Sequence, residues 1–131
     1  MRQRLVLIMI ICAVSLSATA LSVYQRQQQQ YRAGVAGEQQ GDFMVALTGY
    51  ESAIRMYLPF SDTVRHSAER IWALGQAAEQ RREIELALIA YRSLRSAFYA
   101  VAWLQQPGQD WIDRCDTKIA ALAPLRKGNK P

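Results

Sequence analysis

The chain has 131 residues, half of them hydrophobic and about a fifth charged, with a formal net charge of +5. The excess charge belongs to the two ends, because the stretch from Arg26 to Lys118 holds 11 basic and 11 acidic residues. A near-neutral body offers no basic face for a polyanion, so a nucleic-acid partner is not expected. Two cysteines, Cys12 and Cys115, exclude a disulfide framework or a cysteine-based metal site.

The first element is an apolar segment that follows Arg2 and Arg4, and no further charge occurs before Arg26. The 20 residues from Leu5 to Tyr24 form, as a helix, a rod of about 30 Å, the thickness of one hydrocarbon core. We therefore expect residues 1–24 to be a single-pass transmembrane anchor that contacts lipid through residues 5–24. Ala13, Ser17 and Ala20 share one side of this helix and would allow close packing against another membrane helix.

The same segment also fits a cleavable signal peptide. Its basic start, its apolar run to Leu16 and the small-residue pattern Ala18-Thr19-Ala20 would permit cleavage after residue 20. The alternative product is a soluble, exported binding protein. For a retained anchor, three positive groups precede the segment and Arg26 and Arg32 follow it. This bias predicts a cytoplasmic N-terminus and, in a bacterial cell, a periplasmic body held at the inner (cytoplasmic) membrane.

The remaining elements are all predicted to be helical. The glutamine-rich stretch from Val23 to Tyr31 contains no helix breaker, so it should continue the anchor outward as a rigid stalk. Asp42 is a predicted N-cap for a helix to Tyr57, which Pro59 ends. Three further helices are predicted, from Ser61 or Asp62 to about Arg81, from Glu83 to Leu104, and from Asp110 (paired with Asp113 in a capping box) through Trp111, Cys115, Ile119 and Leu122. The basic tail, residues 126–131, is expected to be disordered.

The middle of the chain repeats itself with a period of 41 residues. The matching positions are Gly34 and Gly75, Ala46-Leu47 and Ala87-Leu88, Tyr50 and Tyr91, and Ser52 and Ser93. A fixed period of this length predicts stacked helix pairs, each of which buries its apolar face against the next.

Together with Gly41-Asp42-Phe43, Ala53-Ile54 and Pro59, this pattern resembles a tetratricopeptide (TPR) repeat. The resemblance implies an all-α domain of α-hairpin repeats over residues 25–125, with the last helix as a C-terminal cap, and it is nearly silent about the ligand. The second copy departs from the pattern with Arg82 at the turn glycine, Leu94 at a small position and Arg95 at an apolar one. The period is also longer than the family's, which is about 34 residues.

Catalytic chemistry is not expected, and no cofactor or metal is implied. His66, the only histidine, has Asp62 and Glu69 at helix-surface spacing, which is typical of a salt pair. Cys115 lies on an apolar stripe and reads as a buried thiol. The alternative of another class is a small cell-envelope enzyme or ligand-binding protein, for which His66 is the only candidate functional residue.

The function expected from the sequence is therefore a non-enzymatic, membrane-anchored adaptor or small accessory subunit in a membrane complex. Tyrosine, tryptophan and arginine are enriched where proteins bind one another. On that basis the predicted protein-binding residues are Tyr50, Arg55, Tyr57, Arg92, Arg95, Tyr99 and Trp103. The partner is expected to be another membrane or envelope protein, and the sequence does not indicate an oligomeric state.

Overall fold

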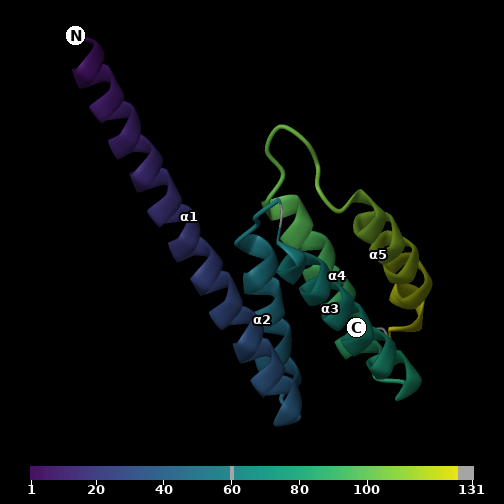
Figure 1. Cartoon of the computed structure of the whole chain (residues 1–131). Helices are drawn as coiled ribbons and strands as arrows, with labels where there is room; N and C mark the ends of the chain where they lie inside the picture. The colour runs from purple at the N-terminus through teal and green to yellow at the C-terminus, as the bar shows by residue number, and fades with distance from the viewer. Residues whose placement is uncertain (60, 127–131) are drawn as a thin grey trace, which may run out of the picture.

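The computed structural model describes residues 1–59 and 61–126, and in these residues it contains helices and no strand (Figure 1). The elements are α1 (Arg2–Gln39), α2 (Phe43–Arg55), α3 (Asp62–Gln80), α4 (Ile84–Ala100), α5 (Gln109–Leu122) and the short 3-10 helix η1 (Ala123–Leu125). The predicted all-α class and the predicted five helices are confirmed. The part of the tail beyond Arg126 lies outside the described residues, so the prediction for it stays a prediction.

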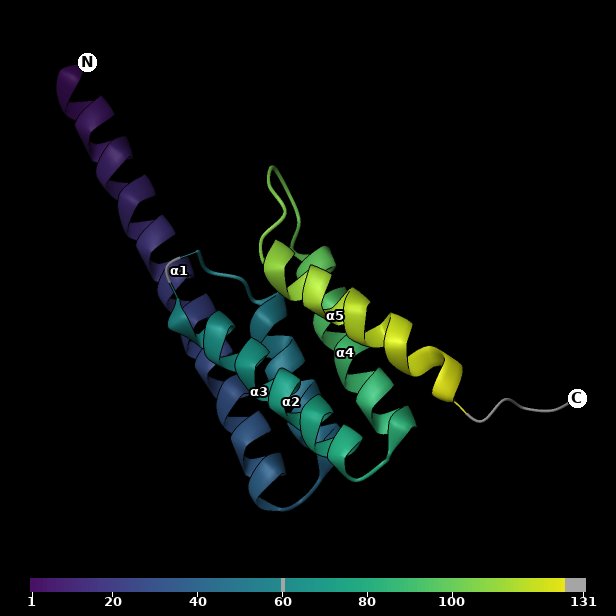
Figure 2. The ribbon, with the colours of Figure 1, turned by 90° about the vertical axis from the view of Figure 1, so that its right-hand side faces the viewer.

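The helices run alternately up and down, so their connections gather at two ends of the body (Figures 1 and 2). The α1–α2 turn, the α3–α4 turn and the end of α5 lie at one end, which we call the distal end. The α2–α3 connection (residues 56–59 and Ser61) and the α4–α5 connection (residues 101–108) lie at the other, the proximal end. The N-terminal half of α1 projects from the proximal end, beyond every other helix.

Helix α1 is continuous, but its two halves have different surroundings: the N-terminal half is exposed and the C-terminal half packs in the body. It is the one helix in the described residues that is long and apolar enough to cross a membrane, and none of its apolar segment is buried against the body. Its first buried residue is Gln27. The Gln27 amide donates to the backbone oxygens of Ala53 at 3.1 Å and Met56 at 2.9 Å, and its oxygen accepts from the Ser61 hydroxyl. The glutamine-rich stretch therefore continues the helix, as predicted, and also locks it into the body.

The C-terminal half of α1 pairs with α2, and α3 pairs with α4, so the body contains two helical hairpins. Each pair is centred on a buried tyrosine that lies over a glycine of the partner helix, Tyr50 over Gly34 and Tyr91 over Gly75. The 41-residue spacing of the sequence thus reproduces the same contacts twice. One core of buried side chains joins the helices, and it consists of Ala46, Leu47, Tyr50, Ile54, Val64, Ala68, Ile71, Ala78, Ala87, Leu88, Ala90, Tyr91, Leu94, Ala97, Phe98, Ile112, Cys115 and Leu122.

The turns of the two hairpins are also alike, although their residues differ. Gly41 adopts φ of +71° and Arg82, at the same place in the second turn, adopts φ of +60°. Both turns close with matching backbone bonds, from Asp42 N–H to Gly37 O at 2.8 Å and from Glu83 N–H to Ala78 O at 2.9 Å. The second turn therefore keeps the left-handed geometry without the glycine that makes it inexpensive.

Three predicted helix boundaries are wrong. Helix α2 ends at Arg55 rather than Tyr57, because the Gln27 amide takes the carbonyls of Ala53 and Met56 at its last turn. Helix α4 ends at Ala100 rather than Leu104, since Phe98 is the last side chain of this helix that reaches the core and further turns would have nothing to pack against.

The third wrong boundary is the start of α5. Gly108, with φ of +68°, is the N-cap, and neither Asp110 nor Asp113 forms the expected capping box. The Asp113 carboxylate instead accepts from the Gln109 amide at 2.7 Å. The predicted cap at Asp42 is confirmed, because its carboxylate accepts from Val45 N–H at 3.0 Å. The sequence left the start of α3 open between Ser61 and Asp62, and Ser61 is the N-cap, accepting from Thr63 N–H at 3.3 Å.

Candidate functional site

The predicted binding residue Tyr50 is buried, which removes it from any surface. Its ring packs on Gly34, and its hydroxyl donates to the Glu38 carboxylate at 2.6 Å. Burial disfavours ionisation of Glu38, but donors from Arg70 and from Tyr50 outweigh it and hold the carboxyl pKa below its ordinary value. Burial and the same bond raise the pKa of Tyr50 to about 12, so the phenol stays protonated and structural.

The second hairpin repeats this arrangement with a different cation. Tyr91 donates to Glu79, which also forms an ion pair with Lys118 of α5 at 2.8 Å. Burial opposes ionisation here too, but Lys118 and then Tyr91 keep the Glu79 pKa low. In each case the next helix provides the cation: Arg70 of α3 pairs with Glu38 of α1, and Lys118 of α5 pairs with Glu79 of α3. Glu38 and Glu79 are also 41 residues apart, so the repeat period could have predicted this pair of carboxylates, which is absent from the sequence-based prediction.

Helix α5 is fixed to the second hairpin by aromatic and charged contacts. The Arg114 guanidinium lies over two neighbouring indole rings, 4.4 Å from the centre of Trp72 and 4.3 Å from that of Trp111, and the two ring centres are 6.0 Å apart. The predicted surface residue Arg95 points to the same helix and forms an ion pair with Asp116 at 2.6 Å. Arg95 therefore joins α4 to α5, and a change there would disturb the fold as well as any surface.

The five remaining predicted residues lie in two places, three on helices α2 and α4 and two at the proximal end. Arg55 and Arg92 are exposed on α2 and α4, and Tyr99, 52% exposed, follows Arg92 two turns later. We call the exposed stripes of these two adjacent helices the α2–α4 face, made of Met44, Thr48, Arg55, Ile89, Arg92, Ser96 and Tyr99. Within the described residues Arg55 pairs only with Glu51 of its own helix, at 2.7 Å, and Arg92 forms no ion pair.

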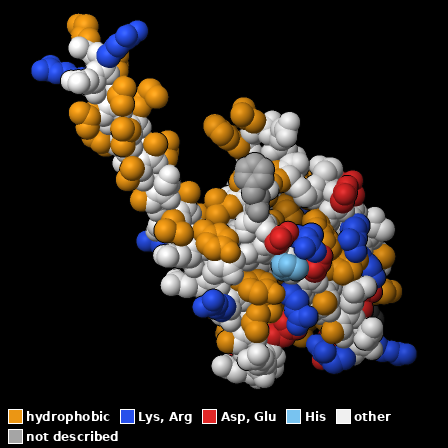
Figure 3. All heavy atoms as spheres, in the orientation of Figure 1, with side chains coloured by type: hydrophobic (Ala, Val, Ile, Leu, Met, Phe, Trp, Pro, Cys, Tyr) orange, Lys and Arg blue, Asp and Glu red, His pale blue; other side chains and the backbone are white. Residues whose placement is uncertain are grey.

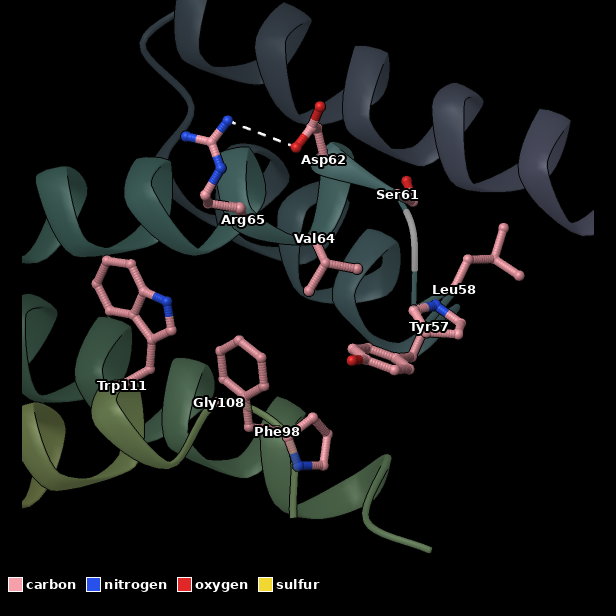
Figure 4. Close-up of a pocket in the computed structure, with 11 residues that line it drawn as sticks. Tyr57, Leu58, Ser61, Asp62, Val64, Arg65, Phe98, Gly108 and Trp111 are labelled. Atoms are coloured by element: carbon pink, nitrogen blue, oxygen red, sulfur yellow. Dashed lines mark ion pairs between the residues drawn. The ribbon is translucent and has the colours of Figure 1, made fainter. Parts of the chain in front are cut away.

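Tyr57 and Trp103 come together at the proximal end. They line one hollow of about 650 Å³ with Pro59 and with the α4–α5 connection. A second hollow of about 370 Å³ lies beside it, with Val64, Phe98 and Trp111 among its lining residues (Figure 4). Asp62 and Arg65 lie on its edge and form an ion pair at 3.6 Å. This end is therefore built mostly of aromatic and aliphatic groups.

The predicted packing residues of the anchor, Ala13, Ser17 and Ala20, are exposed on the free half of α1. The Ser17 hydroxyl donates to the Ala13 carbonyl at 2.8 Å, so its polar group is satisfied within the helix. The small-residue side thus remains open to another helix, and its role stays a prediction.

The groups considered for chemistry are placed as helix-surface or core residues. His66 is exposed, with Nδ1 3.5 Å from the Glu69 carboxylate. Cys115 is buried, and burial together with the neighbouring Asp116 raises its thiol pKa to about 12, which leaves the thiol unreactive. Among the described residues, no group of three or more histidine, cysteine or acidic side chains is arranged to hold a metal. Comparison with protein-family models, with curated proteins and with solved structures finds no match for this chain.

Proposed function

We propose that this chain is a membrane-anchored, TPR-like adaptor that has no catalytic activity and binds another membrane or envelope protein. The observation that carries the proposal is the division of α1. Its N-terminal half is apolar and contacts none of the body, while its C-terminal half forms the first helix of the core. A helix shared in this way would hold the body at a fixed distance from a bilayer, as a tether for a binding surface.

The α2–α4 face is the proposed binding surface. It presents two arginines together with three exposed apolar side chains, Met44 at 52%, Ile89 at 38% and Tyr99 at 52% exposure. Arginine and tyrosine are frequent anchors at protein interfaces, where they combine apolar contact area with hydrogen bonds. By contrast, the charges between successive helices are already paired, Arg70 with Glu38 and Lys118 with Glu79.

The location proposed for the protein is the inner membrane, with a cytoplasmic N-terminus and a periplasmic body. The charge bias across the anchor supports this orientation. Anchoring both partners in one membrane raises their effective concentration, so a face of modest size would be sufficient for binding. The proposed partner is a protein, and the near-neutral body does not favour nucleic acid.

The experiment is crosslinking and affinity purification of the full-length tagged protein from native membranes. The variant Arg92→Glu/Tyr99→Ala alters the α2–α4 face without touching the buried core, and we expect it to lose the co-purified partner. The matched control, Arg126→Glu/Leu125→Ala, also reverses one arginine and truncates one exposed apolar residue, at the distal end, and should retain the partner. Equal recovery of the same partner by both variants would remove the α2–α4 face from the proposal.

The same sample tests the anchor through its N-terminus. A retained Met1 in the membrane fraction is the expected result. Cleavage after Ala20 would leave the core side chains of α1 in place, since the first of them is Gln27. A soluble mature protein that begins at Leu21 would therefore contradict the anchored adaptor and favour the exported, soluble binding protein.

A further inference from the structure

We infer that the α4–α5 connection is a second membrane contact, which inserts Trp103 and Leu104 into the interfacial layer of the bilayer that α1 crosses. This inference rests on the proposed membrane anchoring. It assigns to the proximal end a ligand, the lipid interface, in place of the protein partner expected from the sequence for Trp103. Three observations carry it: the position of the connection, its exposure and its lack of charge.

The position follows from the order of the helices. The connection rises from the body on the side from which the free half of α1 projects, and both views agree on this (Figures 1 and 2). If the 20 residues from Leu5 to Tyr24 fill the hydrocarbon core, the first buried residue, Gln27, lies about 5 Å further along the helix. The proximal end of the body then begins within the headgroup layer. A connection that rises from this end meets lipid.

The exposure of the connection is unusual for its residues. Trp103 is 90% exposed and Leu104 is 83% exposed, whereas Trp72 and Trp111 are partly buried and stacked on Arg114. In Figure 3 hydrophobic side chains stand out at the top of the body, on the side of the projecting helix. Nothing in the described chain covers these two side chains. A tryptophan in such a place suits the membrane interface, where its ring enters the apolar layer and its N–H stays hydrated.

The charges of the body are arranged to match. The sequence has no charged residue between Arg95 and Asp110, and none between Arg55 and Asp62, so neither proximal connection carries a charge. The distal turns, in contrast, hold Glu38, Asp42, Glu79, Arg81, Arg82, Glu83 and Glu85. A charged group in the apolar layer is costly, so only the proximal end is suited to contact it.

The depth of the contact is limited by the backbone of the connection. Residues after Val101 leave the helix, and an irregular segment exposes peptide groups that need water or headgroups as partners. The Gln106 amide donates to the Phe98 carbonyl at 3.0 Å, beside the Val101 N–H at 3.3 Å, and so fixes the base of the connection. We therefore place Trp103 and Leu104 at the level of the headgroups and upper acyl chains, and not in the centre of the bilayer.

The test is fluorescence quenching by brominated lipid. The full-length protein is reconstituted into phosphatidylcholine vesicles whose acyl chains are brominated near the headgroup, and wild-type emission is compared with that of Trp103→Phe. Trp72 and Trp111 provide the same background in both. We expect the quenched component and a blue-shifted emission to be lost in Trp103→Phe. The matched control, Trp103→Phe/Leu125→Trp, moves the exposed tryptophan to the distal end and should not be quenched.

Flotation of the vesicles separates the two hypotheses. Protein that does not float with the vesicles contradicts the membrane anchoring itself. Protein that floats, but whose Trp103 emission is insensitive to brominated lipid, keeps the anchor and overturns the second contact. A blue shift of the Trp103 emission that occurs only after a protein partner is added overturns the second contact as well. The connection would then bind protein and not lipid. Circular dichroism of Trp103→Phe should match the wild type, since the side chain is exposed.

Discussion

The two hairpins of the body differ most in how closely their helices approach each other. In the first, α1 and α2 meet through Gly34, Gly37 and Gly49, and a Cβ added to Gly49 would lie 2.3 Å from the Gly34 backbone nitrogen. In the second, the residue equivalent to Gly49 is Ala90, so α3 and α4 leave room for a methyl group at the same place. Both hairpins nevertheless contain one equivalent contact between aromatic rings. The ring centres of Tyr31 and Tyr50 are 5.5 Å apart, and those of Trp72 and Tyr91 are 4.9 Å apart.

This difference shows which features the hairpin needs and which it tolerates. The tyrosine over a glycine, the carboxylate that accepts from it and the left-handed turn occur twice. The backbone contact and the turn glycine occur once each, in the hairpin that contains α1. We interpret the closer packing of the first hairpin as the reason that the C-terminal half of α1 is held firmly to the body.

The variant with the largest expected effect is Gly49→Ala. The new methyl group would meet backbone atoms of α1, which cannot rotate away, so we expect a loss of about 3 kcal/mol in the free energy of unfolding. Thermal unfolding in mild detergent, followed by circular dichroism, measures it. The reverse change in the second hairpin, Ala90→Gly, should cost only about 1 kcal/mol through helix propensity. Equal effects of the two changes would show that the hairpins do not differ in closeness.

Gly34→Ala and Gly75→Ala test what the hairpins share. In each case the added Cβ would lie 2.7 Å from the ring of the tyrosine that packs on it, Tyr50 or Tyr91. The ring can shift slightly, so we expect each variant to lose about 2 kcal/mol of stability, less than Gly49→Ala. Alanine at the exposed neighbour, Thr48→Ala, serves as the control and should change stability by less than about 0.5 kcal/mol. A large loss in only one of the two glycine variants would contradict the equivalence of the contacts.

Substitutions in the two hairpin turns should change the free energy of unfolding in opposite directions. Arg82 adopts the left-handed backbone that costs a residue with a side chain about 1 kcal/mol, so Arg82→Gly should raise the free energy of unfolding by somewhat less than that. Gly41→Ala places a side chain in the same conformation and should lower stability by about 1 kcal/mol. Chemical denaturation of both variants in the same detergent gives the two values. Destabilisation by Arg82→Gly would indicate that the arginine side chain makes a contact worth more than the strain.

The smallest expected effect is a loss of stability in acid. Glu38 and Glu79 both have a folded pKa below the reference value of 4.5, so the unfolded chain takes up their protons first as the pH falls. Their contribution is complete above that value and disappears as the pH drops through the lower folded pKa. We expect each pair to contribute less than about 1 kcal/mol, because the groups are partly solvated.

Thermal unfolding between pH 7 and pH 3 measures this contribution. The double variant Glu38→Gln/Glu79→Gln should be less stable at neutral pH and should lose less stability than the wild type in acid. An acid dependence as steep as that of the wild type would assign the effect to other carboxylates.

Much of the fold could be predicted from the sequence because it depends on local patterns. The cap at Asp42, and the paired glycines and tyrosines, are each determined by residue type and spacing, whereas residue type alone left Ser61 and Asp62 as alternative starts of α3. The 41-residue period correctly anticipated that Gly34 and Gly75 have the same role. It did so because each contact lies within one hairpin, where spacing along the chain determines spacing in three dimensions.

The candidate sites were less predictable, because exposure depends on which helix covers which. Tyr50 and Arg95 have the residue types of an interface, but the first is covered by α1 and the second faces α5. The exposure of Trp103 results from the early end of α4, which depends on where the core stops and not on helix propensity. Only the packed structure separates the α2–α4 face from the proximal end.

The unbroken course of α1 from Arg2 to Gln39 has a mechanical consequence. A continuous helix transmits rotation along its axis. The hydrogen bonds from Gln27 to the end of α2 join the free half of α1 directly to the body. A rotation imposed on the free half, for example by a helix that docks against Ala13 and Ser17 as predicted, would be passed on to the body. If the free half of α1 crosses a bilayer, as proposed, a contact made there would therefore influence the direction in which the α2–α4 face points.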